Sequence, residues 1–440
     1  MRKNLREKAL EIFFYALNSI LPKNIIPKTV DIQQDKIKIE KDIYSLKNGF
    51  YVFGSGKASV EMAKTIESMA FDLIIDGVVI SNYTEELDKI TVLEGSHPVP
   101  TEKTINATKK LIEKFKSLKE DDFFIYLLSG GSSSLLEIPI SPISIQDLQE
   151  TTQLLLKKSV PIDEINVIRK HISQVKGGRL ARLTKAKGIV LVISDVIGDD
   201  LKVIGSAPLY MDNSTYKDAY NILVKYDLWD KVPLSVKEVI QKGLQGQIED
   251  TPKKPPSNIK HYIIANNFKA LSYAKKKAQE LGFEAKILTS SLHGEAREVA
   301  KAIMSIGREI KSSSNPFPPP VCLISGGETT VNVTGNGKGG RNQEMALSAL
   351  KELKDLDSVV FLSAGTDGID GNSDADGAIV DINSYYKAQK LGLDVDTYLK
   401  NNDSYNFFKK TGDLIITGKT GTNVMDIQIL LIGDEHAKNI

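Results

Sequence analysis

The sequence predicts a two-domain α/β protein. With 440 residues the chain exceeds the size at which one hydrophobic core usually stops growing. Short, almost continuous apolar runs alternate with helical patterns, which is typical of parallel strands buried on both faces. We expect an N-terminal Rossmann-like α/β/α sandwich with a mainly parallel sheet. We expect a C-terminal α/β domain with a mixed sheet, because strand patterns become denser after Val359.

Composition and charge exclude several kinds of protein. A net charge of +1 gives no electrostatic reason for binding nucleic acid or an anionic membrane. Glu7 and Glu11 interrupt the apolar start at helical spacing, so an amphipathic helix fits better there than a signal peptide or a membrane anchor. The single cysteine, Cys322, excludes an intramolecular disulfide and a cysteine-based metal site. We expect a cytoplasmic protein with small-molecule partners, and the oligomeric state stays open, a homodimer included.

The predicted strands lead into loops rich in glycine, serine and aspartate. These strands are Phe50–Phe53, Phe123–Leu128, Gly188–Ile193, Val321–Ile324 and Val359–Leu362, and a last predicted strand, Ile427–Ile432, ends the strand-rich part of the chain. The carboxyl ends of parallel strands meet at one edge of a sheet, where ligands bind in this class of fold. These loops are therefore the candidate ligand-binding segments.

One stretch of the chain indicates a domain boundary. Residues 243–260 are polar, contain glycine and proline, and show no periodicity, as expected of a linker. We predict an N-terminal domain at residues 1–243, a linker at 244–260 and a C-terminal domain at 261–440.

The loop that begins at Gly54 follows a strand and opens a helix. Backbone N–H groups at Gly54 and Gly56, with the positive end of the helix, suit an anion, and Lys57 suits a phosphoryl group or a carboxylate. The loop is close to the dinucleotide-binding fingerprint, although Ser59 replaces its third glycine. A tight turn with a solvated lysine is the structural alternative.

Two further loops of the first domain suit anionic groups. The serine loop combines flexible glycines with hydroxyls that can surround an oxyanion, and it consists of Ser129, Gly130, Gly131, Ser132 and Ser133. A second segment places His171, Lys176 and Arg179 around one glycine turn, which suits carboxylate or phosphate recognition. We predict substrate binding for both segments. The alternatives are a purely structural loop and a solvated basic helix end.

Carboxylates at strand ends are the predicted metal ligands and proton acceptors. Asp195 lies next to the end of a predicted strand, where a carboxylate can hold Mg²⁺ or accept a hydroxyl proton. Helix capping is the alternative. A Walker phosphate loop is rejected at Gly418, because Asp413 stands where the motif needs its first glycine.

The second domain carries glycine loops and clustered aspartates within about 55 residues, which together favour a Mg²⁺–phosphate platform. Asp367 is the predicted metal ligand there. The predicted nucleotide-binding residues in these loops are Ser325, Gly326, Gly327, Glu328, Gly337, Gly339, Gly340 and Asn342, and Gly54 and Gly56 join them from the first domain. The string KGGR occurs once in each domain, ending at Arg179 and at Arg341.

Taken together, the ordered motifs VFGSGKAS, LLSGGSSSL, KGGRLA, ISDVIGD, ISGGETTV, GKGGRNQE and ITGKTGTNV resemble those of a known family. The chain is similar to glycerate kinases with an N-terminal glycerate-kinase domain and a C-terminal MOFRL domain, over nearly its whole length. The resemblance implies ATP- and Mg²⁺-dependent phosphorylation of D-glycerate, typically at the 2-hydroxyl. It also implies that Lys57 and Arg341 are the leading active-site residues.

We therefore expect a kinase with D-glycerate and ATP as substrates and Mg²⁺ as cofactor, in which Lys57, Arg341 and Asp195 are catalytic. Glycerate is expected at the serine loop and Lys57, with its carboxylate near Arg179, and ATP at the second domain's glycine loops. Two alternatives stay open: phosphorylation at the 3-hydroxyl, and an NAD(P)H-dependent hydroxypyruvate reductase that uses the loop at Gly54. A non-catalytic sugar-phosphate sensor is disfavoured, because clustered aspartates repel phosphate unless a metal intervenes.

Overall fold

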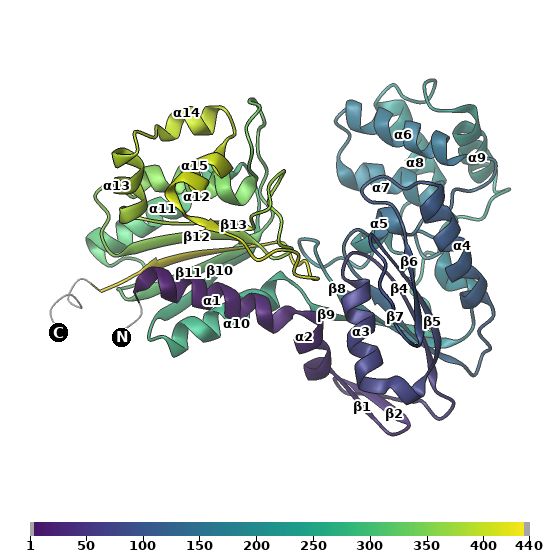
Figure 1. The fold of residues 1–440 in the computed structure, drawn as a ribbon. Helices are drawn as coiled ribbons and strands as arrows, with labels where there is room; N and C mark the ends of the chain where they lie inside the picture. Colours follow the sequence, from purple (N-terminus) through teal and green to yellow (C-terminus); the bar gives the residue numbers. More distant parts are fainter. Residues whose placement is uncertain (1–3, 435–440) are drawn as a thin grey trace. The chain divides into compact units, whose positions relative to one another are not determined.

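The computed structural model describes residues 4–434 and divides into two compact units. The first unit is Ile25–Ile264, and the second unit is Met1–Asn24 together with Ala265–Ile440. Each unit has a six-stranded sheet with helices packed on it (Figure 1). The predicted two-domain α/β fold is confirmed.

The sheet of the first unit has the strand order β6-β5-β4-β7-β8-β9. Its strands are β4 (Phe50–Ser55), β5 (Ile74–Ser81), β6 (Ile90–Glu94), β7 (Phe123–Leu128), β8 (Lys187–Ile193) and β9 (Ile259–Ala265). The four pairs from β6 to β8 are parallel, as predicted from the continuous apolar runs. The ends of β4, β7 and β8 therefore bring the loops at Gly54, Ser129 and Asp195 to one edge.

Helices α3 (Ser59–Ala70) and α4 (Glu102–Lys116) cover opposite faces of this sheet (Figure 1). Under α4 the rings of Phe53, Phe115 and Phe124 meet edge to face at 5.0–6.4 Å between centroids, an arrangement that aromatic quadrupoles favour. The short helix α5 (Ser132–Leu135) follows β7 directly.

A helical layer and a small sheet complete the first unit. The helices α6 (Ile145–Lys157), α7 (Ile162–His171), α8 (Tyr216–Lys225) and α9 (Leu234–Leu244) share an apolar core of their own. The small sheet is antiparallel and consists of β1 (Val30–Gln33), β2 (Lys36–Ile39) and β3 (Asp42–Ser45), after α2 (Pro22–Thr29).

The sheet of the second unit is mixed, as predicted, with the order β10-β11-β15-β12-β13-β14. Its strands are β10 (Glu284–Leu292), β11 (Val321–Gly327), β12 (Val359–Gly365), β13 (Gly377–Asp381), β14 (Leu414–Ile415) and β15 (Asp426–Ile432). β15 runs antiparallel between β11 and β12. Its first residue, Asp426, is therefore paired with both Gly327 and Gly365, the last residues of its neighbours.

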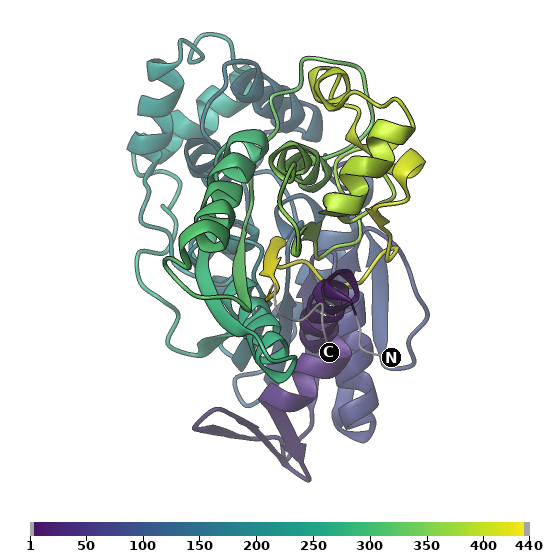
Figure 2. The same ribbon diagram turned by 90° about the vertical axis from the view of Figure 1, so that its left-hand side faces the viewer.

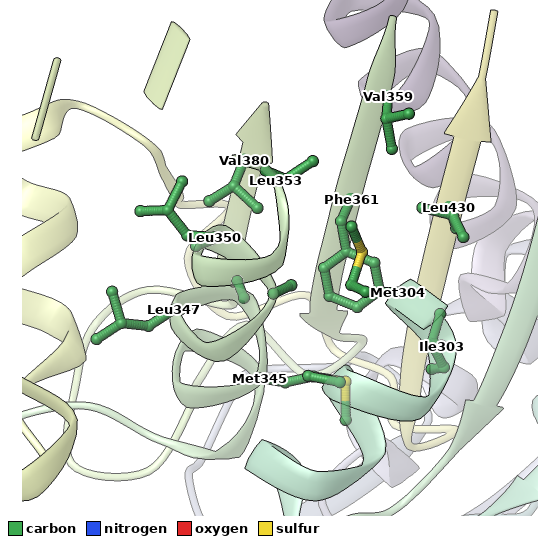
Figure 3. Close-up of a cluster of buried hydrophobic side chains, with 14 of the residues drawn as sticks. Ile303, Met304, Met345, Leu347, Leu350, Leu353, Val359, Phe361, Val380 and Leu430 are labelled. Carbon is green, nitrogen blue, oxygen red and sulfur yellow. The ribbon is translucent and has the colours of Figure 1, made fainter. Parts of the chain in front are cut away.

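Helices lie on both sides of this sheet (Figures 1 and 2): α1 (Leu5–Ile20) and α10 (Asn267–Glu280) on one, α11 (Ala296–Ser313) and α12 (Arg341–Glu352) on the other. Figure 3 shows the core beneath α11 and α12, where Met304, Met345 and Leu350 pack with Phe361 of β12 and Leu430 of β15. The remaining helices are α13 (Ile382–Lys390), α14 (Val395–Lys400) and α15 (Ser404–Thr411).

The compact units differ from the predicted domain boundaries at two places. Helix α1 groups with the second unit, because Ile12, Phe13 and Ile20 are buried and the helix packs on α10, β12 and β15. In addition, β9 begins at Ile259 as an edge strand of the first sheet, so the first unit extends past the predicted linker.

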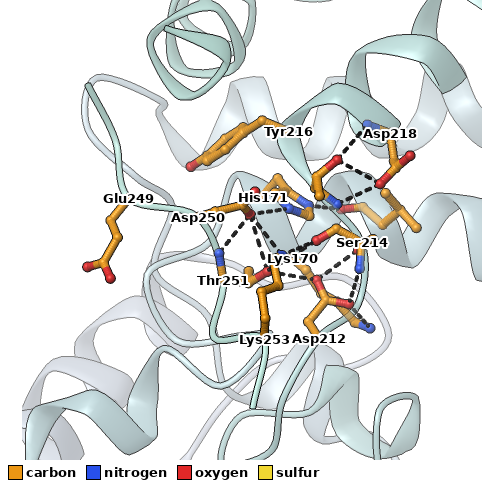
Figure 4. A network of polar contacts seen from close by, with 12 residues as sticks. Lys170, His171, Asp212, Ser214, Tyr216, Asp218, Glu249, Asp250, Thr251 and Lys253 are labelled. Carbon is orange, nitrogen blue, oxygen red and sulfur yellow. Dashed lines mark hydrogen bonds and ion pairs between the residues drawn. The ribbon is translucent and has the colours of Figure 1, made fainter. Parts of the chain in front are cut away.

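The predicted linker itself is anchored to the first unit. Thr251 is buried and donates from its hydroxyl to Asp212 Oδ2 at 3.1 Å, and Asp250 accepts a hydrogen bond from the ring of His171 at 2.9 Å (Figure 4). The segment is polar and aperiodic because its side chains form hydrogen bonds with the first unit, and it is not a flexible linker.

Candidate functional site

In the first unit, the loops after β4 and β7 form one continuous surface. The φ angle of Gly56 is +129°, and a Cβ at this position would lie 2.2 Å from Ser129 Oγ, so only glycine allows the approach. Lys57 N–H donates to the Gly130 carbonyl at 2.8 Å, and Ala58 N–H donates to Ser129 Oγ at 3.0 Å. The two loops predicted to bind anions thus meet.

Lys57 presents an unpaired cation beside this surface. Within residues 4–434 its ammonium has neither a hydrogen bond nor an ion pair, and the side chain is partly buried. A Cβ on Gly131 would lie 3.1 Å from Lys57 Cγ and 3.2 Å from His97 Cδ2, so the lysine and the histidine flank the same glycine. Burial and the positive charge of Lys57 lower the pKa of His97 to about 4. His97 is therefore neutral near pH 7.

Asp195 and Arg169 border the same loop. A Cβ on Gly130 would fall 1.8 Å from Asp195 Oδ2, so the carboxylate lies directly over the glycine. Arg169 donates to the carbonyl of Ser133 at 3.4 Å, while its Nε is buried without a partner. Burial lowers the pKa of Arg169. Two cations and one carboxylate thus surround the serine loop, while the hydroxyls of Ser129 and Ser132 are buried and bonded within the protein.

The other predicted substrate-binding residues have structural partners instead. Lys176 is fully buried and donates to Glu137 Oε2 at 2.5 Å and to the Leu136 carbonyl at 2.9 Å. His171 is buried between the Val167 carbonyl and Asp250, at 2.7 and 2.9 Å (Figure 4).

Arg179 also has partners within the protein. It donates to the Glu249 carbonyl at 2.9 Å and to the Tyr216 hydroxyl at 3.0 Å. The structure therefore brings together Lys57, Asp195 and the serine loop, and places His171, Lys176 and Arg179 in contacts that hold neighbouring segments.

In the second unit, Arg341 is the first residue of α12 and is clamped by carboxylates. Its Nε and one terminal nitrogen donate to the two oxygens of Asp426 at 2.6 and 3.0 Å, which is a bidentate pair. Its other terminal nitrogen donates to Glu328 Oε1 at 2.8 Å. The Asp426 side chain is fully buried, whereas that of Glu328 is 48% exposed. The contact with Asp426 is thus buried, whereas the contact with Glu328 is open to solvent.

Asp370 holds the start of α12 in place. Its two oxygens accept hydrogen bonds from the backbone N–H groups of Asn342 and Gln343, at 3.1 and 2.9 Å, which caps the helix. A Cβ on Gly340 would lie 2.4 Å from Asp370, so the preceding loop must carry glycine there. Burial raises the pKa of Asp370 to about 7.

Several amides predicted to bind phosphate already have partners in the protein. Gly337 N–H donates to the Asn401 carbonyl and Gly339 N–H donates to Asn372 Oδ1, at 2.9 and 2.8 Å. Hydrogen bonds therefore hold the glycine loop at 335–340 against neighbouring segments. The predicted residues Ser325, Gly326 and Gly327 form the end of β11, which leads directly to Glu328.

The carboxylates that could hold a metal lie beside the turn at 417–420. Burial and the charge of Asp367 raise the pKa of Asp376 to about 6. Asp376 Oδ1 accepts a hydrogen bond from Thr417 Oγ1 at 2.8 Å, and its Oδ2 is buried without a partner. Among residues 4–434 no three His, Cys, Asp or Glu side chains form a ready cluster. Mg²⁺ bound with a nucleotide needs only one or two carboxylates besides the phosphates, so Asp367 and Asp376 fit it.

Sequence reasoning did not single out Asp426. It stands at the start of an apolar strand and is 85 residues from Arg341 in sequence. The available signal was a charged residue next to a predicted buried strand, which burial rules make unusual unless it is paired. The partner could not be identified without the strand order.

Comparison with known proteins shows to which family the chain belongs. A model of a domain of unknown function, DUF4147, matches residues 8–241, and the MOFRL family model matches residues 321–426. The chain is 43% identical over 438 residues to a glycerate 2-kinase of Pyrococcus horikoshii, covering 99% of both chains. It is 43% identical over 434 residues to a D-glycerate 2-kinase of Thermotoga maritima, covering 98% of this chain and 99% of the relative. The chain belongs to the glycerate kinase family.

Solved structures of the glycerate kinase family share the fold as well. A crystal structure of a protein from Pyrococcus horikoshii matches with a TM-score of 0.88 and 43% identity, covering 99% of this chain and all of the other. The glycerate kinase of Thermotoga maritima matches with a TM-score of 0.87 and 42% identity, covering 97% and 99%. A relative from Agrobacterium vitis, provisionally named a hydroxypyruvate reductase, is 38% identical over 387 residues, or 87% of each chain. None of the described helices is long and apolar enough to span a membrane.

Proposed function

We propose that this protein transfers a phosphoryl group from ATP to the 2-hydroxyl of D-glycerate. The observation that carries the proposal is the 43% identity, over practically the full length, to two proteins named glycerate 2-kinases from different organisms. The hydroxypyruvate reductase name belongs to a relative of lower identity that matches a smaller share of the chain.

D-glycerate would bind on the first unit, at the serine loop. Its carboxylate needs cationic and N–H donors, and the unpaired ammonium of Lys57 lies beside the loop with Arg169 at Ser133. His97 is neutral at pH 7 and so adds a donor or acceptor without a second charge beside Lys57. Asp195, over Gly130, would accept the proton of the reacting hydroxyl.

The phosphates of ATP would bind on the second unit, near Arg341. Phosphoryl transfer depends mainly on positioning and on neutralising the charge of the transferring group. Asp426 fixes the guanidinium plane through two hydrogen bonds, which leaves the edge now bonded to the half-exposed Glu328 for a phosphate oxygen. The glycine loop shapes the start of α12, whose N–H groups at Asn342 and Gln343 are already capped by Asp370.

Mg²⁺ would join the nucleotide at Asp367 and Asp376 of the second unit. When bound, the ion would neutralise charge on the phosphates. The buried and unpartnered Oδ2 of Asp376 is the feature that a cation would satisfy.

The reaction is tested directly by incubating the protein with ATP, Mg²⁺ and D-glycerate and following the products by phosphorus NMR. We expect 2-phosphoglycerate and ADP. Formation of 3-phosphoglycerate would change the assigned hydroxyl, and absence of a phosphorylated product would refute the kinase. Loss of NADH absorbance with hydroxypyruvate would favour the reductase instead.

Two substitutions test the assigned charges. Lys57→Met and Arg341→Met should each lower kcat by about 100-fold or more, the usual effect of losing a charge-stabilising donor. Lys64→Met is the matched control, because Lys64 lies on helix α3 and, among the described residues, forms ion pairs with the partly exposed Glu61 and Glu85. Near-normal turnover in both site variants would contradict the assignment.

A further inference from the structure

The second unit has a cavity of about 700 Å³ to which the proposed reaction assigns no part of either substrate. Its lining includes Phe14, Tyr15 and Leu17 of α1 and the turn at Thr417, Lys419 and Thr420. Phe14 is 42% exposed, although Phe13 and the other core residues of α1 are buried. The exposed ring of Phe14 and the polar turn at 417–420 therefore line the same cavity.

The turn presents a cation on fixed supports. Thr417 Oγ1 donates to Asp376 Oδ1 at 2.8 Å, and Thr420 Oγ1 donates to the Thr366 carbonyl at 2.6 Å, so both ends of the turn are tied down. Between them Lys419 has neither a hydrogen bond nor an ion pair within the described residues, and it is exposed. An unpaired ammonium in this position is available to an anionic ligand.

A series of contacts leads from the cavity to Arg341. The loop of Asp367 touches the turn so closely that a Cβ on Gly368 would lie 2.0 Å from the Gly418 carbonyl. A Cβ on Gly365 would lie 3.5 Å from one oxygen of Asp367 and 3.5 Å from one oxygen of Asp426. Asp426 in turn holds Arg341. Aromatic wall, free lysine, carboxylates and arginine therefore follow one another across this unit.

A nucleoside triphosphate has a matching order of groups, with a planar base at one end and metal-bound phosphates at the other. We propose that the cavity binds the base of the nucleotide co-substrate against Phe14, with Lys419 contacting its phosphates. A planar base buries apolar surface against an aromatic ring, and polyphosphate attracts an unpaired ammonium. Glycerate has almost no apolar surface to place there. The inference rests on the proposed kinase reaction, because it assigns the ligand to the co-substrate of that reaction.

Binding and kinetics of three variants of the full-length protein test the inference. Phe14→Ala should weaken ADP binding, measured by calorimetry with Mg²⁺, by about tenfold, a typical effect of losing one stacking ring. It should raise KM for ATP by a similar factor and leave KM for D-glycerate unchanged. Phe268→Ala is the matched control, because Phe268 is a 56% exposed ring of α10 that does not line the cavity.

Inorganic tripolyphosphate separates the two walls of the cavity. It should bind equally to the wild type and to Phe14→Ala, and more weakly to Lys419→Met. Unchanged ADP binding in Phe14→Ala would overturn the base site, even if phosphoglycerate is formed. A protein that binds ADP through Phe14 but forms no phosphoglycerate would keep the base site and refute the proposed reaction, so the two failures are distinguishable.

Discussion

At the scale of single residues, the surroundings of each cation distinguish residues that stabilise the fold from residues that can bind a ligand. A buried charge is costly unless a partner is bonded to it. Lys176 is buried and bonded to Glu137, whereas Lys57 is partly buried with no ion pair among the described residues. Arg341 has both kinds of contact, since Asp426 is buried and Glu328 is half exposed. A ligand can bind an unpaired cation, or a cation whose carboxylate partner is exposed to solvent.

His97 gives a pH dependence with a definite sign. Its pKa is lowered to about 4 by burial and by Lys57, below the value of about 6.5 in an unfolded chain. Between these values the unfolded chain binds more protons, so acidification from pH 6.5 to 4 lowers the free energy of unfolding. Above pH 6.5 this contribution is constant. We expect urea unfolding of His97→Asn at pH 7 and 4.5 to show a smaller acid loss than the wild type. An NMR titration midpoint near 6.5 for His97 would contradict this.

At the scale of elements, pairs of buried polar residues fix the loops that carry the site. Glu137 follows α5 and the serine loop, and Lys176 opens the second glycine turn, so their contact ties the two segments together. Ser173 adds a hydrogen bond to the other oxygen of Glu137 at 2.5 Å. The same logic applies in the second unit, where Asp370 caps α12 and thereby places Arg341.

Removing one member of the buried pair should therefore destabilise the protein strongly. Lys176→Met leaves Glu137 buried without its cation, which typically costs about 3–5 kcal/mol in free energy of unfolding. The double variant Glu137→Gln, Lys176→Met should recover much of this loss, because the uncompensated charge is gone. Urea unfolding measures both. A loss below about 1 kcal/mol in the single variant would refute the supporting role of Lys176.

At the scale of the whole molecule, the chain forms its second unit from two separated stretches. Helix α1 lies at the start of the chain and packs on α10 and on strands β12 and β15 of the second unit. It thereby contributes Phe14 to the cavity that the turn at Lys419 also lines. Helix α1 is consequently part of the packed structure of the second unit.

Loss of the α1 contact should affect one unit only. Phe13 is fully buried, so Phe13→Ala should lower the stability of the second unit by about 3–5 kcal/mol. Hydrogen exchange followed by mass spectrometry should become faster in residues 265–434 and stay unchanged in residues 25–264. Phe14→Ala, at an adjacent but 42% exposed position, is the control and should change exchange little. Faster exchange confined to residues 25–264 would contradict the assignment of α1.

The sequence alone determined the parts of the molecule that local patterns encode. The apolar run Phe123–Leu128 predicted strand β7 with its observed bounds. The glycine and serine loops after β4 and β7 are also evident in the sequence; the structure shows that they meet, and their binding role stays a prediction. Continuous apolar strands can only be buried on both faces, and glycine is required where two backbones approach closely, so such features appear in the sequence.

Only the tertiary structure decided which residues meet. The motif KGGR occurs twice, yet Lys176 of the first copy is buried against Glu137 and Arg341 of the second is clamped by Asp426. Likewise, the apolar stripe of α1 shows that the helix must be buried, but not on which unit. Pairing depends on strand order and on contacts between distant segments, and one residue's type and neighbours in sequence do not contain that information.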